Sequence, residues 1–288
     1  MINEHTPGID RRSGLSQRDL LREYVIPNRP VILTDAVQDW KAVGKWTPAF
    51  FKERYGWIIK EIAGQHYTLG EQADRMLSST PANPAPYPYN LEVGDYFPEL
   101  MEDLSPQLVF GKSDRALHPL MPKALMNGTP IHEVFFGGHG SSFPFVHYDA
   151  LQLHTQITQI YGEKEIILYH PDDSAYMYPR KDNPKFSQVT DVFRPDLEKF
   201  PLFAHATPYR DVLRPGDTIY FPRGWWHTTM MYGPSITYGR IVLNASNYNA
   251  YLNDKRERWS RSGKLKAGVA MGVGRTVGAL MSALETLK

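Results

Sequence analysis

Short apolar segments separated by glycine and proline turns fill the second half of the chain, and their spacing restricts the fold more than any other feature. Gly162-Glu163, Arg214-Pro215-Gly216-Asp217 and Gly233-Pro234 mark the turns between them. Five segments are expected to be strands: 153–161, 164–169, 209–213, 218–221 and 236–243. Tight turns join antiparallel strands, whereas parallel strands need a long crossover connection. The spacing therefore predicts a mainly β fold, a double-stranded β-helix or jelly roll with flanking helices.

The first 128 residues are expected to form a layer of helices and short strands that belongs to the same domain. Ser16 and Thr47 precede helical patterns as N-caps, and Pro48 takes the first helical position. Further strands are expected at 30–34, 57–62 and 131–136, and further helices at 69–77 and 97–104. The chain thus divides into an N-terminal layer, 1–128, a jelly-roll core, 129–248, and a helical tail, 249–288. An aromatic insert at 172–207 is expected to pack as a lid.

The tail has apolar residues at helical spacing, and this stripe has no obvious place in a jelly roll. Four glycines weaken the segment as an isolated helix. The stripe consists of Val269, Val273, Val277, Leu280 and Leu284. We expect a packed helix that forms a homodimer interface, in preference to a helix on a membrane surface.

Composition places the chain among ordinary globular proteins. Of its 288 residues, 42% are hydrophobic and 22% charged, and the formal net charge of +1 provides no bulk attraction to nucleic acid or to anionic membranes. Cysteine is absent, which excludes disulfides and thiolate metal ligands. The polar first residues lack the apolar core of a signal peptide, and we found no run approaching the eighteen apolar residues of a membrane-spanning helix. These features predict a cytoplasmic protein with neither nucleic acid nor membrane as its partner.

One His-x-Asp pair and one distant histidine form the candidate metal site. His147 and Asp149 are two residues apart, so an extended strand would point both side chains to one face. His227 follows 78 residues later in Gly224-Trp225-Trp226-His227 and can close the third corner. Two imidazoles and one carboxylate on one face of an ion leave other positions open, as in non-haem Fe(II) oxygenases. A core histidine beside a solvated aspartate is the alternative.

Four further polar residues are candidates for contact with an oxo-acid co-substrate. Lys164 follows the turn after the strand 153–161 and could hold a carboxylate, although a solvated lysine at a hairpin is the alternative. Thr155 and Asn244 could line the interior, and Tyr89 could supply a phenolic donor.

Three motifs in order resemble the JmjC, or cupin-8-type, Fe(II)/2-oxoglutarate oxygenases, and among them the asparaginyl hydroxylases. They are His147-Tyr148-Asp149, the run from Gln159 to Lys164, and Pro215-Gly216-Asp217 through Phe221-Pro222 to Trp225-Trp226-His227. The resemblance covers roughly 30–248. It implies His147, Asp149 and His227 as iron ligands, Lys164 as partner of the 2-oxoglutarate C5 carboxylate, and Tyr89 and Asn244 as further co-substrate contacts. Fe(II), 2-oxoglutarate and O₂ are the implied cofactors and co-substrates.

The chain departs from this pattern at two places. Pro144 stands where the relatives often have threonine, so Ser142 or Thr155 would have to supply the missing hydroxyl. The interval from His147 to the glycine turn is two residues longer, so either His154 or Thr155 fills the position of the family's asparagine.

The functional prediction is an oxygenase that couples 2-oxoglutarate decarboxylation to hydroxylation of a protein side chain or a small molecule. A non-catalytic cupin-like binding or scaffold protein with a vestigial metal site is the alternative, and a cupin enzyme independent of 2-oxoglutarate is a third class. The sequence does not identify the primary substrate.

Overall fold

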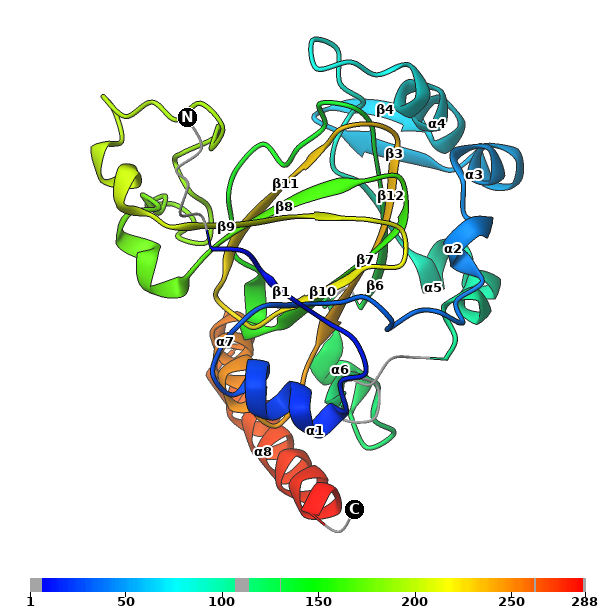
Figure 1. The fold of residues 1–288 in the computed structure, drawn as a ribbon. Helices are drawn as coiled ribbons and strands as arrows, with labels where there is room; N and C mark the ends of the chain where they lie inside the picture. Colours follow the sequence, from blue (N-terminus) through cyan, green and yellow to red (C-terminus); the bar gives the residue numbers. More distant parts are fainter. Residues whose placement is uncertain (1–6, 107–113, 130, 262, 287–288) are drawn as a thin grey trace.

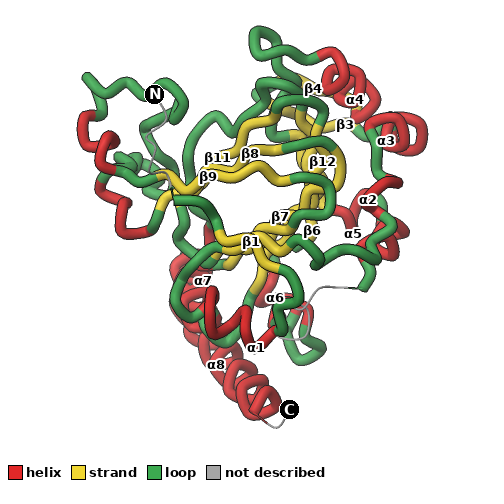
Figure 2. The backbone as a smooth tube through the Cα atoms, viewed as in Figure 1, coloured by secondary structure: helices red, strands yellow, loops and turns green. Residues whose placement is uncertain are grey.

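The computed structural model describes residues 7–106, 114–129, 131–261 and 263–286. Two β-sheets face each other in its centre, and helices cover the outer side of the larger one (Figure 1). Figure 2 shows the strands gathered into these two facing layers, with most helices on one side and below them. This is the mainly β architecture with flanking helices and a C-terminal helix that the turn spacing predicted.

The larger sheet has seven strands in the order β1-β2-β10-β7-β12-β6-β5. Its members are β1 (Asp10–Arg12), β2 (Val31–Leu33), β5 (Tyr89–Glu92), β6 (His132–Gly137), β7 (His154–Tyr161), β10 (Thr218–Phe221) and β12 (Ser235–Val242). All neighbours are antiparallel except β1 and β2. Three of the strands come from the N-terminal part of the chain, so that part contributes to the sheet itself as well as covering it.

The smaller sheet has the order β11-β8-β9, with β8 (Lys164–Tyr169), β9 (Pro208–Leu213) and β11 (Trp226–Met231). The chain passes from β7 in the larger sheet to β8 in the smaller one at Gly162, whose φ is +69°. A Cβ there would lie 1.9 Å from the Pro234 carbonyl oxygen. The turn before β10 has Pro215 and then Gly216 at φ +95°, which is the type II arrangement expected from the sequence.

Short helices and one hairpin form the layer over the outer face of the larger sheet. Thr47 caps α3 and Thr68 caps α4 with a reciprocal hydrogen bond to Glu71. The helices of this layer are α1 (Gln17–Leu20), η1 (Leu21–Val25), α2 (Ala42–Lys45), α3 (Pro48–Tyr55), α4 (Leu69–Ser78), α5 (Val93–Tyr96) and η2 (Pro98–Leu104). Two more helices, η4 (Arg115–Leu117) and α6 (Lys123–Met126), pack instead with the C-terminal helices. The hairpin pairs β3 (Ile59–Ile62) with β4 (Gln65–Thr68).

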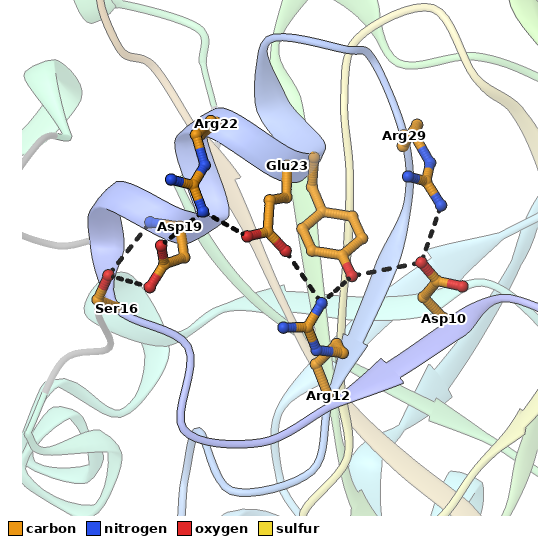
Figure 3. Close-up of polar contacts among 8 residues, drawn as sticks. Asp10, Arg12, Ser16, Asp19, Arg22, Glu23 and Arg29 are labelled. Atoms are coloured by element: carbon orange, nitrogen blue, oxygen red, sulfur yellow. Dashed lines mark hydrogen bonds and ion pairs between the residues drawn. The ribbon is translucent and has the colours of Figure 1, made fainter.

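Surface ion pairs connect η1 and the segment before β2 to the first strand (Figure 3). Arg12 Nη1 lies 3.0 Å from Glu23 Oε2 and 2.9 Å from Tyr24 Oη, and Arg29 reaches Asp10 at 2.9 Å. Ser16 accepts a hydrogen bond from the Asp19 amide, as expected of an N-cap. Because these pairs are exposed, solvent screens them and they add little to stability.

Apolar clusters separate the layers. Side chains from both sheets meet in one cluster between them, which contains Ile166, Leu168, Ile219, Phe221 and Trp225. The N-terminal layer packs on the outer face of the larger sheet through a second, larger cluster. The expected aromatic insert contains η6 (Pro171–Ala175) and η7 (Pro201–His205) and packs on β8 and Trp226 through a third. The space between the sheets is therefore filled at one end and leaves a pocket at the other.

The tail forms two helices, α7 (Tyr248–Ser260) and α8 (Lys264–Thr286). Gly274 and Gly278 let α8 approach α7 closely, because a Cβ at either glycine would lie 2.7 Å or less from Leu252 or Tyr248. The opposite face is open, and Leu265, Val269 and Leu280 are 83%, 61% and 54% exposed. By length and composition α8 could cross a membrane, so our sequence-based expectation that no such segment exists was wrong. Figure 1 shows α8 extending from the body of the molecule.

Candidate metal centre and co-substrate pocket

The structure brings His147, Asp149 and His227 together, and their ligand atoms all lie within 4.8 Å of one another. Nε2 of His147 and Nε2 of His227 each lie 3.9 Å from Asp149 Oδ1. A six-coordinate ion with bonds of about 2.1 Å sets neighbouring donor atoms about 3 Å apart. Each of the two nitrogen–oxygen distances would therefore shorten by about 1 Å when the three residues bind one ion. Two imidazoles and one carboxylate suit a divalent transition ion with free coordination positions.

The local backbone of the His-x-Asp pair differs from the regular strand that the sequence suggested. His147 forms single β-bridges with Phe186 and His227, while Asp149 precedes a short 3₁₀ turn, η5 (Ala150–Gln152). The amides and carbonyls of His147 and His227 exchange two hydrogen bonds, at 3.1 and 2.7 Å. The aromatic insert therefore holds this stretch on one side and β11 holds it on the other.

Hydrogen bonds orient two of the three candidate ligands. His227 Nδ1 lies 3.1 Å from the Trp225 carbonyl oxygen, which can only accept, so Nδ1 carries the proton and Nε2 is free to bind metal. The Thr155 hydroxyl donates to Asp149 Oδ2. Thr155 thus faces the site. Of the two residues considered for the family's asparagine position, it is the one that contacts a candidate metal ligand. His154 instead points away, to Ser246 at 3.0 Å and to the Arg223 amide at 3.1 Å.

The charges of the triad favour metal binding. Burial and the neighbouring His227 lower the pKa of His147, so its imidazole is neutral at physiological pH. Burial alone would raise the pKa of Asp149, but the two histidines and the Thr155 hydroxyl bring it below its usual range. Neutral imidazole and ionised carboxylate are the protonation states that a metal ion requires.

A pocket of about 90 Å³ opens beside the triad between the two sheets. Side chains from β6, β7, β8, β11 and β12 line it, together with Tyr87 and Phe143 from loops. The full lining is Tyr87, Ile131, Glu133, Phe135, Phe143, His147, Asp149, Thr155, Ile157, Lys164, His227, Thr229, Thr237, Gly239, Arg240 and Ile241.

Lys164 and Arg240 are the cationic residues among the described lining; Arg240 is paired with Asp114, and Lys164 is 3% exposed. Its ammonium lies 3.5 Å from the Tyr87 hydroxyl, 5.7 Å from the Tyr87 ring centre and 6.0 Å from that of Phe135. Burial lowers its pKa to about 7, and no carboxylate of the described residues forms an ion pair with it. A buried ammonium without a carboxylate partner is costly. The arrangement is therefore complementary to an anionic ligand, and the solvated hairpin lysine is excluded.

Two sequence-predicted contacts lie elsewhere. Tyr89 belongs to the core on the outer side of the larger sheet, and its hydroxyl donates to the Ile58 carbonyl at 3.0 Å. Asn244 is also outside the pocket lining, and its Oδ1 accepts from the Ser246 amide and hydroxyl at 2.9 and 2.6 Å. Tyr87, in the proline-rich stretch before β5, takes the place expected of Tyr89. Ser142 does not replace the hydroxyl missing at Pro144 either, because it turns to the Phe143 carbonyl.

Sequence reasoning missed Tyr87, Glu133 and Thr229 as pocket residues. The alternation within β6 offered a signal for Glu133, because Ile131, Glu133 and Phe135 share one face. Both tryptophans next to His227 are core residues. The indole of Trp225 donates to the Asn28 carbonyl and that of Trp226 to Ser174.

Comparison with known proteins matches residues 60–240 to the cupin-like domain family. Lysine-specific demethylase 8 of Xenopus tropicalis is 27% identical over 217 residues, which is 71% of this chain and 46% of that protein. Lysine-specific demethylase JMJ21 of Arabidopsis thaliana is 24% identical over 271 residues, 91% of this chain and 28% of its own length. tRNA wybutosine-synthesizing protein 5 of Danio rerio is 35% identical over 86 residues, 30% of this chain and 25% of that protein. The chain thus spans less than half of each relative.

Proposed function

Because the chain belongs to the cupin-like domain family of JmjC/cupin-type Fe(II)/2-oxoglutarate oxygenases, we propose that it is itself an Fe(II)- and 2-oxoglutarate-dependent hydroxylase. The observation that carries this proposal is the buried Lys164 in the same pocket as the three convergent ligands. A metal site alone would fit many cupins, whereas the additional cation fits a dicarboxylate that also reaches the metal.

The residues of the chain have distinct tasks in this proposal. His147, Asp149 and His227 would hold the iron, and Thr155 would fix the Asp149 carboxylate by its hydrogen bond. Lys164 would bind the distal carboxylate of 2-oxoglutarate, with the Tyr87 hydroxyl as a neighbouring donor. When bound, iron would supply the oxygen activation that converts 2-oxoglutarate to succinate and CO₂ and transfers one oxygen atom to the substrate.

The primary substrate is a protein side chain or a small molecule in this proposal. The names of the relatives point to lysine for two of them and to tRNA for another, so they do not single out one substrate class for this chain. The near-neutral net charge gives no bulk attraction to RNA, which favours the first two classes over tRNA.

Anaerobic titration with Fe(II) and 2-oxoglutarate tests the proposal. The expected result is a weak visible charge-transfer band in the parent protein and succinate formation once oxygen is admitted. His147→Ala and Asp149→Ala should lose the band and the turnover while keeping the fold. The reason is that the site has three protein ligands, and all three are needed to hold the ion. His66→Ala, at an exposed histidine outside the site, is the matched control and should behave as the parent. Turnover retained in either ligand variant with normally bound iron would refute the assignment.

A further inference from the structure

Glu133 is a carboxylate in the pocket for which the proposed chemistry has no task. The strand register places the inner face of the larger sheet in rows across β6, β12 and β7. Phe135, Thr237 and Gln159 form one row, next to Lys164; Glu133, Gly239 and Ile157 form the second. The third row contains Thr155, which binds Asp149. Since two residues along a strand span about 7 Å, Glu133 lies between the level of the lysine and that of the metal ligands.

The contacts of Glu133 leave one of its oxygens available. Oε1 accepts a hydrogen bond from Asn90 Nδ2 at 2.5 Å, whereas no described residue donates to Oε2. Lys60 makes no hydrogen bond to Glu133, because its ammonium binds the Asn90 carbonyl and side-chain oxygens at 2.5 and 2.9 Å. Burial raises the pKa of Glu133, and the Asn90 hydrogen bond and the nearby Lys60 charge oppose this rise. Asn90 therefore holds the carboxylate in position without neutralising it.

The other acidic neighbour of Glu133 has a different task. Glu92 stands directly opposite on β5 and accepts hydrogen bonds from the Ile131 and His132 amides at 3.2 and 2.9 Å. It is outside the pocket lining. Two carboxylates opposite each other on neighbouring strands repel, so a cation near Glu133 would also relieve this repulsion.

Within the described pocket lining, the charges of the loaded site leave no cation to balance Glu133; Lys60, which binds Asn90, lies outside that lining. A divalent ion and Lys164 together carry three positive charges, and Asp149 and the 2-oxoglutarate dianion carry three negative ones. Arg240 is already paired with the fully buried Asp114 at 2.5 Å. The co-substrate is an anion and cannot be the partner of Glu133. The partner must come from the molecule that enters next, which is the primary substrate.

We propose that Glu133 binds a cationic group of the primary substrate, an ammonium or a guanidinium, and so selects amine- or guanidine-bearing side chains or metabolites. This inference rests on the proposed oxygenase function and assigns the substrate class of the same site. Glu133 acts as a specificity residue, because it contacts the substrate at a distance from the reacting carbon and performs no chemical step.

Equilibrium binding to the complex of the protein with Zn(II) and 2-oxoglutarate tests the assignment without turnover. The probes are the N-acetyl amides of lysine and arginine, each compared with its neutral counterpart, norleucine or citrulline. At least one cationic probe should bind more tightly than its counterpart. Glu133→Gln keeps the shape and the Asn90 contact, and should weaken cation binding about 10-fold or more, as expected for a lost charge-assisted hydrogen bond. Succinate release with the iron-loaded enzyme provides a second readout.

Glu92→Gln is the matched control, because it removes the neighbouring carboxylate one strand away; its amide oxygen can keep only one of the two backbone hydrogen bonds, so its stability is measured beside its binding. It should leave the preference for the cationic probe unchanged. The assignment is wrong if cationic and neutral probes bind alike, including when neither binds, or if Glu133→Gln alters 2-oxoglutarate affinity more than cation affinity. If the parent protein binds 2-oxoglutarate, these results contradict only the role of Glu133 and not the oxygenase proposal. If the parent does not bind 2-oxoglutarate, the oxygenase proposal itself is wrong.

Discussion

At the scale of single residues, Lys164 distinguishes a 2-oxoglutarate enzyme from a generic iron cupin. Removing its ammonium would leave the bound carboxylate desolvated without a partner, at a cost of about 2–5 kcal/mol. This corresponds to roughly 30-fold to several-thousand-fold in affinity. We expect Lys164→Ala to weaken 2-oxoglutarate binding by at least that lower factor while Fe(II) affinity barely changes, and Lys164→Arg to lie between. Isothermal titration against both ligands checks this. Unchanged 2-oxoglutarate binding in Lys164→Ala would contradict the role of the lysine.

The pH dependence of the same interaction follows from the pKa of Lys164. Burial lowers the pKa to about 7 in the free protein, whereas a bound carboxylate favours the charged form and raises it. Affinity should therefore be nearly constant below pH 7 and fall above it, by up to about tenfold per pH unit, until the pKa of the complex is reached. Titration at pH 8 in buffers of different ionisation enthalpy should show proton uptake on binding. Lys164→Arg stays charged, so its affinity for 2-oxoglutarate should lack this pH dependence. Equal binding of 2-oxoglutarate by the parent protein at pH 6 and pH 9 would disprove the role of lysine protonation.

Among the secondary-structure elements, α8 is the one whose exposed face still lacks a partner in the described structure. Small residues and apolar side chains cover that face, including Gly268, Gly272, Val269, Val273 and Leu280. We propose that a second copy of the chain covers it. Truncation near Ser262 would also remove Met271 and Met281 from the core, so surface substitutions are the cleaner test.

The double variant Val269→Lys/Leu280→Lys should shift the chain toward monomer, because it places like charges in the interface. The helix itself should persist, since lysine has a higher helix propensity than valine. Light scattering measures the mass of each species. Leu77→Lys, at a 59% exposed leucine of α4, is the control and should keep the mass of the parent. A parent that is already monomeric would exclude self-association, and binding of the parent to lipid vesicles would instead assign α8 to a membrane.

For the molecule as a whole, the metal ion should act as a cross-link between distant parts of the chain. His227 comes from the smaller sheet, whereas His147 and Asp149 lie in the loop that follows β6 of the larger one. Metal at about 100 times its dissociation constant should stabilise the fold by about 2.7 kcal/mol. At about 2–4 °C per kcal/mol for a chain of this size, the Tm should rise by roughly 5–10 °C.

Thermal unfolding with and without Mn(II) checks this expectation. The shift should disappear in His227→Ala and persist in His66→Ala, which removes an exposed histidine outside the site. An equal shift in both variants would mean that the ion binds elsewhere on the surface.

Local patterns in the sequence were sufficient to predict the β architecture, the boundaries of β8 and β10, the N-caps Ser16 and Thr47 and the three convergent residues. These features depend on local rules: turn chemistry, side-chain alternation and capping act over a few residues and can be recognised there. The apolar stripe of α8 is also a local pattern, so it was recognised in the sequence. That α8 is long and apolar enough to cross a membrane was not recognised.

Which polar residues face the pocket depends on how the two sheets pack together. Tyr87 and Tyr89 are alike in the sequence, and their roles differ because Tyr89 lies on the outer face of β5 while Tyr87 precedes the strand. Thr155 and His154 are adjacent, and the pleat of β7 turns only the first toward Asp149. Glu133 and Lys164 share one pocket because two sheets pack face to face. Such contacts join segments that are distant in the chain, so no local pattern could specify them.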